Sequence, residues 1–136
     1  MFKLIKIINS GVNVPELRTM NKDTNVSARS GELLKMNSAG RLTNCSYGDK
    51  PKYIAVSSAE RNEPYVVCFE IMPNMLFESR LNGEPRDVSV GMKVSLEGDE
   101  DGYLSSVSSS NEYEIATIYD MTETKRYGDK IVVRFE

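Results

Sequence analysis

The chain has 136 residues, of which 40% are hydrophobic, and its 17 Lys and Arg against 20 Asp and Glu give a net charge of -3. This size and composition are typical of one globular domain and exclude a multidomain, disordered or membrane-spanning protein. The acidic balance argues against a nucleic-acid partner, and the absence of histidine removes the commonest general base and metal ligand.

The N-terminal segment, residues 1–24, is predicted to be an extended arm or a first strand. Its apolar stretch, residues 2–8, is interrupted by a lysine and is too short for a signal-peptide core, so we expect a protein made and kept in a cytoplasm. The stretch either opens a barrel or pairs with a neighbouring subunit at a sheet edge. We assign it a partner-contact role, with the lysines facing an acidic surface, at Phe2, Lys3, Leu4, Ile5 and Lys6.

Residues 25–136 are predicted to form a single all-β domain. Their hydrophobic pattern has a period close to two, and β-branched or aromatic runs such as 53–56, 65–69 and 131–135 are separated by turn signals such as Asn82-Gly83. We find no helix longer than two turns and expect about ten strands.

The order of motifs in residues 31–71 recurs in residues 91–136. The offset between the two copies drifts through 60, 62, 61 and 66 residues, measured from Gly31 to Gly91, Gly40 to Gly102, Ala55 to Ala116 and Val66 to Val132. Each copy is a four-strand unit that alone would leave a sheet face exposed. We therefore expect the two similar units to close on each other into one compact β-barrel or sandwich, with residues 120–129 as a longer final loop.

A connector, residues 72–90, lies between the two units. Pro73 cannot donate to a sheet ladder, so the connector suits an edge strand or a passage between sheets. Its apolar residues Met75, Leu76 and Phe77 are the second candidate region for partner contact. The other interpretation of these residues is ordinary core packing.

The acidic run 97–101 is the densest group of carboxylates, and clustered oxygens can hold Ca²⁺. The run is much shorter than a calcium loop of about 12 residues. A charged hairpin tip ending in Asp101-Gly102 explains it without an ion, so we expect no metal site.

No motif for catalysis or cofactor binding is present. Cys45 and Cys68 are expected to be buried free thiols in a reducing compartment, and neither has a base nearby in the sequence. The serine-rich stretch 105–110 lacks a nucleophile elbow. The seven tyrosines lie beside acidic residues, which does not favour a nucleic-acid interface. We expect a protein that is not an enzyme and binds no cofactor.

Several motifs resemble small proteins encoded beside the major capsid protein in tailed phages and prophages of Gram-positive bacteria. They span nearly the whole chain and are Leu4-Ile5-Lys6, Asn9-Ser10, Asn13-Val14-Pro15-Glu16, Gly31-Glu32-Leu33-Leu34-Lys35-Met36, Lys50-Pro51-Lys52-Tyr53-Ile54, Met72-Pro73-Asn74-Met75-Leu76-Phe77-Glu78, Gly91-Met92-Lys93-Val94 and Val132-Val133-Arg134-Phe135-Glu136. The resemblance implies a head decoration or cement protein, often trimeric, that binds the major capsid protein on the capsid exterior and reinforces junctions between capsomers.

Two other functions stay open. A cytoplasmic β-barrel adaptor for a peptide or protein partner would be a monomer without affinity for capsids. A carbohydrate-binding virion component would use exposed aromatics and calcium, for which only the loop 97–101 is a candidate. The loops 97–101 and 120–129 match no motif of the resembled family, and whether either binds Ca²⁺ or a host surface stays open.

Overall fold

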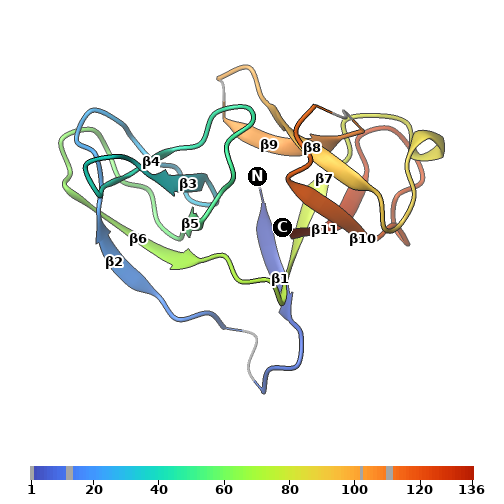
Figure 1. The fold of residues 1–136 in the computed structure, drawn as a ribbon, viewed down its shortest axis with the longest axis horizontal. Coiled ribbons are helices and arrows are strands. Elements are labelled where there is room, and N and C mark those ends of the chain that lie inside the picture. The colour runs from blue at the N-terminus through green and yellow to red at the C-terminus, as the bar shows by residue number, and fades with distance from the viewer. Residues whose placement is uncertain (1, 12–13, 102, 110–111) are drawn as a thin grey trace.

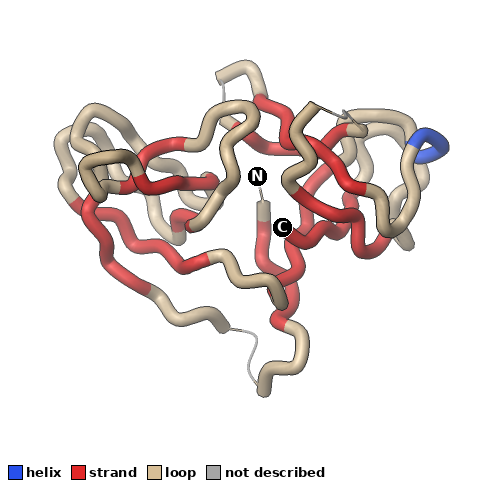
Figure 2. Tube along the Cα trace, in the orientation of Figure 1, coloured by secondary structure: helices blue, strands red, loops and turns tan. Residues whose placement is uncertain are grey.

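The computed structural model describes residues 2–11, 14–101, 103–109 and 112–136. Within these ranges the chain forms eleven strands and one short 3-10 helix, and no helix has the length and apolar character to cross a membrane (Figure 1, Figure 2). The all-β prediction is confirmed. Asn13, Gly102 and Ser110, which belong to motifs described above, lie outside the described residues.

The elements in chain order are β1 (Lys3–Ile7), β2 (Arg18–Asn21), β3 (Leu33–Met36), β4 (Leu42–Asn44), β5 (Tyr53–Ala55), β6 (Tyr65–Glu70), β7 (Met75–Arg80), η1 (Pro85–Asp87), β8 (Lys93–Gly98), β9 (Leu104–Ser108), β10 (Ala116–Asp120) and β11 (Lys130–Phe135). They build two antiparallel sheets, a five-stranded sheet with the order β2-β6-β5-β3-β4 and a six-stranded sheet with the order β1-β7-β11-β10-β8-β9. Figure 1 shows the five-stranded sheet on the left and the six-stranded sheet on the right.

The two sheets repeat one topology. Strands β2–β6 and strands β7–β11 have the same order, with the first strand of each half beside the last. An isolated parallel bridge closes each half at the same place, between Lys22 and Leu42 in the first half and between Leu81 and Val107 in the second. The prediction of two similar units is confirmed, and each unit has a fifth strand at its start.

Matching backbone hydrogen bonds show which residues of the two halves are equivalent. Gly31 donates its N–H to the carbonyl of Ala55, and Gly91 donates in the same way to the carbonyl of Ile118. The expected offset of 60 at Gly31 is therefore confirmed. At β5 and β10 the offset is 63, from Ala55 to Ile118, so Ala116 is not the counterpart of Ala55. The drift arises because the β8–β9 hairpin is longer than the β3–β4 hairpin.

The register at the last strand of each half also differs from the expected one. Pro64 and Asp129 accept equivalent hydrogen bonds from the first strand of their halves, which gives an offset of 65 and not 66. A shift of one residue exchanges the two faces of a strand. This is why Val66 is buried whereas Val132, its expected counterpart, lies half-buried on the outer face.

All four phenylalanines of the chain form one connected row in the core. Phe69 of the five-stranded sheet lies 6.3 Å from Phe77 of the six-stranded sheet, ring centre to ring centre, with the ring planes parallel to within 1°. Phe77 contacts Phe135 at 5.1 Å, and Phe135 contacts Phe2 at 5.4 Å. The row therefore joins the first half, the second half and the N-terminal segment through apolar contact.

The expectation of an edge strand after Pro73 is wrong, whereas that of a passage between sheets is met. Pro73 is the second residue of a turn in which Met75 donates its N–H to the Met72 carbonyl over 3.1 Å. Proline is favoured there because its fixed φ fits the turn and no ladder bond is lost. The strand that follows, β7, lies between β1 and β11 and is not at an edge.

Candidate functional site

The two regions that the sequence suggested for partner contact are neighbours in the structure. The first forms the start of β1, and the second forms the start of β7, with which β1 pairs antiparallel. Leu4 lies opposite Phe77, and Lys6 lies opposite Leu76. Within the N-terminal segment, residues 3–7 are thus a strand of the six-stranded sheet, and residues 18–21 are a strand of the five-stranded sheet.

The side chains of these two regions divide between core and surface. Lys3, Ile5 and Lys6 are exposed and Leu4 is half-buried, whereas four others are buried within the chain: Phe2, Met75, Leu76 and Phe77. For the buried four, the structure favours the alternative interpretation of core packing. The exposed three remain available for contact with a partner.

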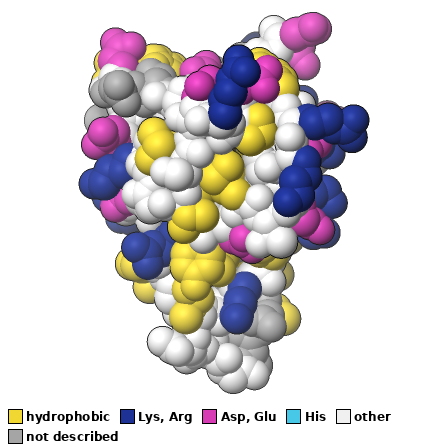
Figure 3. Space-filling view, turned by 90° about the vertical axis from the view of Figure 1, so that its right-hand side faces the viewer, with side chains coloured by type: hydrophobic (Ala, Val, Ile, Leu, Met, Phe, Trp, Pro, Cys, Tyr) yellow, Lys and Arg dark blue, Asp and Glu magenta, His cyan; other side chains and the backbone are white. Residues whose placement is uncertain are grey.

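A β-bulge explains why Ile5 points outward. The pairing of β1 with β7 skips from Leu4 to Lys6, which leaves Ile5 as the extra residue of the bulge. Ile5 is 41% exposed and lines a shallow hollow of about 310 Å³. The hollow is also lined by Val132, by Lys130 and by the carboxylates of Glu78, Asp120 and Glu123. Figure 3 shows one side of the molecule, with hydrophobic side chains near its middle and Lys, Arg, Asp and Glu side chains on both flanks.

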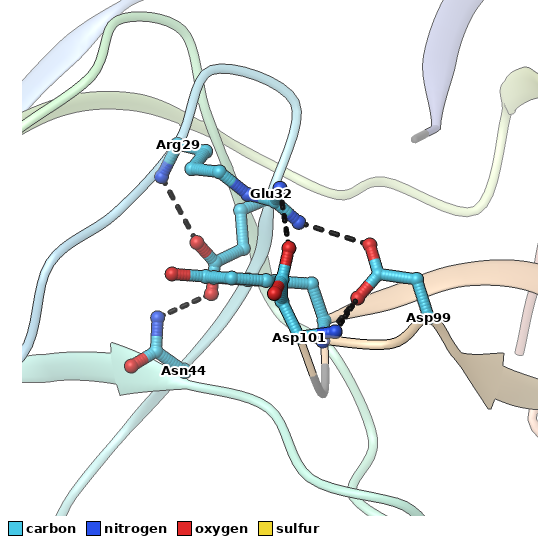
Figure 4. Close-up of polar contacts among 6 residues, drawn as sticks. Arg29, Glu32, Asn44, Asp99 and Asp101 are labelled. Carbon is cyan, nitrogen blue, oxygen red and sulfur yellow. Dashed lines mark hydrogen bonds and ion pairs between the residues drawn. The ribbon is translucent and has the colours of Figure 1, made fainter.

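A second cluster of polar side chains joins the two halves of the chain (Figure 4). The guanidinium of Arg29, from the turn before β3, lies 3.5 Å from the ring centre of Tyr103. It also binds Asp99 at 3.1 Å and reaches Asp101 at 4.0 Å, both at the tip of the β8–β9 hairpin. Because the β8–β9 hairpin is longer than the β3–β4 hairpin, its acidic tip reaches Arg29 in the first half of the chain.

The buried carboxylate of Glu32 holds the backbone of Arg29 by a hydrogen bond. Glu32 is 3% exposed, and its two oxygens accept hydrogen bonds from the backbone N–H of Arg29 at 2.9 Å and from the Nδ2 of Asn44. Burial raises the pKa of Glu32, although these hydrogen bonds and the Arg29 charge oppose the shift. Both carboxylate oxygens are therefore engaged in holding the turn that presents Arg29.

The acidic hairpin tip is organised by protein contacts. Removal from solvent raises the pKa of Asp99, but hydrogen bonds from the Arg29 side chain and from the N–H groups of Tyr103 and Asp101 lower it overall. One oxygen of Asp99 faces Arg29, and the other accepts the two N–H groups at 3.1 and 2.9 Å. Across the part of the chain that the structure describes, no group of three His, Cys, Asp or Glu side chains is placed to hold a metal ion.

A polar hollow of about 260 Å³ lies beside this cluster. Among the described residues that line it, the only thiol, that of Cys45, is not activated as a nucleophile. The walls of the hollow include Glu32, Cys45, Arg61 and Tyr103. Burial raises the pKa of Cys45 to about 12, so its thiol is protonated at neutral pH and unreactive. The prediction of two buried free thiols is confirmed. The cluster is suited to holding the two halves together.

Sequence reasoning identified the acidic tip but missed its partner. Arg29 lies 70 residues away from Asp99 along the chain, and a single arginine in a polar turn carries no signal of its own. The turn that carries Arg29 recurs in the second half, where the Ser89 carbonyl accepts a hydrogen bond from Met92 as the Arg29 carbonyl does from Glu32.

No protein-family model matches this chain, and no curated protein matches it. Among solved structures, the chain is similar to the N base of the head fiber gp8.5 of bacteriophage phi29, known from a crystal structure. The two match with a TM-score of 0.52 over 89% of this chain and 95% of that chain, at 10% sequence identity. A likeness at this identity shows a common fold.

Proposed function

We propose that this protein is a structural, non-enzymatic component of a tailed-phage virion that binds the outside of the assembled capsid. The observation that carries the proposal is the fold shared with the N base of a phage head fiber over nearly the full length of both chains. The sequence motifs described above support it separately, because they resemble proteins encoded beside a major capsid protein.

The polar cluster supports a mechanical role. Arg29, Asp99 and Tyr103 join the two halves, and the phenylalanine row joins them again in the core. A rigid module that presents a fixed surface is what a capsid binder needs, since it loses little conformational freedom on binding.

The proposed partner is the major capsid protein at junctions between capsomers, with the bound protein arranged as a homotrimer. Many identical copies let weak individual contacts sum to stable attachment. A protein that binds only the expanded shell also stabilises that shell by mass action. The proposed location is therefore the capsid exterior, after synthesis in the host cytoplasm.

The outer face around β1 is the proposed contact surface. Lys3 and Lys6 give it positive charge, and Ile5 adds an exposed apolar side chain between them. The carboxylates of Glu78, Asp120 and Glu123 lie around the same hollow, so charges of both signs surround an apolar centre, which suits a partly apolar patch of complementary charges on the shell.

The test is cosedimentation of the purified protein with expanded shells of the encoding phage that lack it. We expect saturable binding at a fixed number of copies per capsomer, and weaker binding by at least tenfold for Ile5→Asp, which places a charge at the centre of the contact. Val90→Asp, at an exposed apolar position outside β1, is the matched control. Absence of binding to expanded and unexpanded shells would overturn the proposal and, with a monomeric mass, favour the adaptor function.

A further inference from the structure

Among the described residues, the second half has a strand, β1, at a position of the repeated topology where the first half has none. In the second half, β1 pairs with the side of β7 that faces away from β11. The counterpart of β7 is β2, because Lys22 and Leu81 make the same hydrogen bonds at the ends of these strands. No described strand pairs with the corresponding side of β2 at residues 17–19, and Figure 1 shows β2 along the lower left margin of the molecule.

The difference is visible in one pair of equivalent leucines. The offset of 59 residues between Lys22 and Leu81 makes Leu17 the counterpart of Leu76. Leu76 pairs with Lys6 of β1 and is 4% exposed, whereas Leu17 is 51% exposed. The side chain that a neighbouring strand helps to cover in the second half is open to solvent in the first.

The backbone of the open edge is oriented to accept a strand. Lys22 donates its N–H to the carbonyl of Pro64, the residue before β6, so in this antiparallel ladder the even-numbered residues of β2 face β6. The odd-numbered residues Leu17 and Thr19 therefore direct their N–H and C=O groups to the open side. Unpaired edges of this kind are templates for pairing with another chain.

The charges beside Leu17 select the partner. Glu16 and Arg18 are both exposed, and neither makes an ion pair within the part of the chain described by the structure. If two copies pair antiparallel about Leu17, Glu16 of each copy lies opposite Arg18 of the other. The neighbouring register, with Leu17 opposite Thr19, places Arg18 against Arg18 and is opposed by like charge.

We propose that the edge formed by residues 16–19 pairs antiparallel with the same edge of a second copy of this chain. Leu17 lies on the two-fold axis, where its N–H and C=O bond to Leu17 of the other copy, and Thr19 donates to the carbonyl of Pro15. Pro15 at the end of the paired segment limits the pairing to this short stretch, because it has no N–H to extend the ladder. The contact links copies in pairs, in addition to the three-fold association proposed above.

The test uses Leu17→Cys, since only a two-fold contact at this residue brings the two introduced thiols within disulfide distance. Under mild oxidation we expect a covalent dimer on a denaturing gel, formed about tenfold faster than for the control Val90→Cys, because pairing raises the effective concentration of the thiols. The native thiols are buried and do not interfere. Equal rates for the two variants would overturn the proposal.

Charge reversal gives a second readout that does not depend on cysteine. We expect Glu16→Arg and Arg18→Glu each to reduce the mean mass measured by light scattering, and the double variant with both changes to restore it, because only the double variant re-forms opposite charges across the axis. Loss of shell binding by Leu17→Asp without any change in mass would instead assign the edge to a segment of the shell and overturn the two-fold contact. Both mass and cross-linking are measured without shells, so they are independent of the proposed capsid function.

Discussion

Arg29 contacts both halves of the chain through one side chain. Its guanidinium stacks on Tyr103 and binds Asp99, and its backbone N–H is held by the buried Glu32. We expect Arg29→Met to lower the free energy of unfolding by about 1 kcal/mol, since the cation–π contact is lost while the apolar stem remains. Chemical denaturation would measure this, with the exposed Arg41→Met as control. Equal effects of the two substitutions would contradict a specific role for Arg29.

The ion pair of Asp49 and Lys35 predicts a pH dependence. The Lys35 hydrogen bond, 2.6 Å long, holds the pKa of Asp49 below its ordinary value of 3.8, so the folded state favours the ionised form. The stabilisation is complete above that ordinary value and is lost as the pH falls through the lower folded-state pKa.

Asp49→Asn is therefore expected to cost about 0.5 kcal/mol at neutral pH, a value reduced by solvent screening, and nearly nothing at pH values below the folded-state pKa. Unfolding curves across the acid range would show the two proteins converging, whereas the exposed control Asp87→Asn stays parallel to the wild type. A constant gap between Asp49→Asn and the wild type would contradict the ion-pair explanation.

The two cysteines predict a reactivity test. Burial raises the pKa of Cys45 to about 12 and also raises that of Cys68, so the reactive thiolate form is disfavoured at both residues, and both are buried. We expect no reaction with a thiol reagent in the folded protein and reaction of both thiols in denaturant. Rapid modification of one thiol in the folded state would show that the core around it is open.

At the scale of elements, β1 belongs to the core as much as to the surface. Phe2 is 2% exposed and contacts Phe135, so Phe2→Ala should lower the free energy of unfolding by about 3 to 5 kcal/mol. The neighbouring Lys3→Ala, at an exposed position, should change it by less than about 0.5 kcal/mol. A small effect of Phe2→Ala in thermal unfolding would mean that β1 docks only loosely and acts as a free arm.

Some features of these elements could be predicted from the sequence and others could not. Strand positions and the repeat were predictable, because alternation and turn residues are local signals. The register was not predictable, because β8 and β9 are longer than their counterparts in the first half. Identical residues such as Ala55 and Ala116 therefore do not occupy equivalent positions. The pairing of β1 with β7 and the reach of Asp99 to Arg29 join residues about 70 positions apart, for which a single sequence carries no signal.

At the scale of the whole molecule, the two halves share one five-strand topology, and only the second half has an additional strand, β1, at its edge among the described residues. The second half receives β1, and the first half keeps an open edge at β2. The phenylalanine row and the Arg29 cluster hold these unequal halves in one body. The molecule thus has an outer face at β1 that carries charges of both signs around Ile5, and a sheet edge at β2 that no described strand pairs with.

Image reconstruction of expanded shells with and without added protein tests capsid attachment most directly. We expect additional density of this fold on the outer surface at junctions between capsomers, with the face that carries Ile5 and Lys6 toward the shell. Density on the inner surface, or no difference between the two reconstructions at saturating protein, would contradict it.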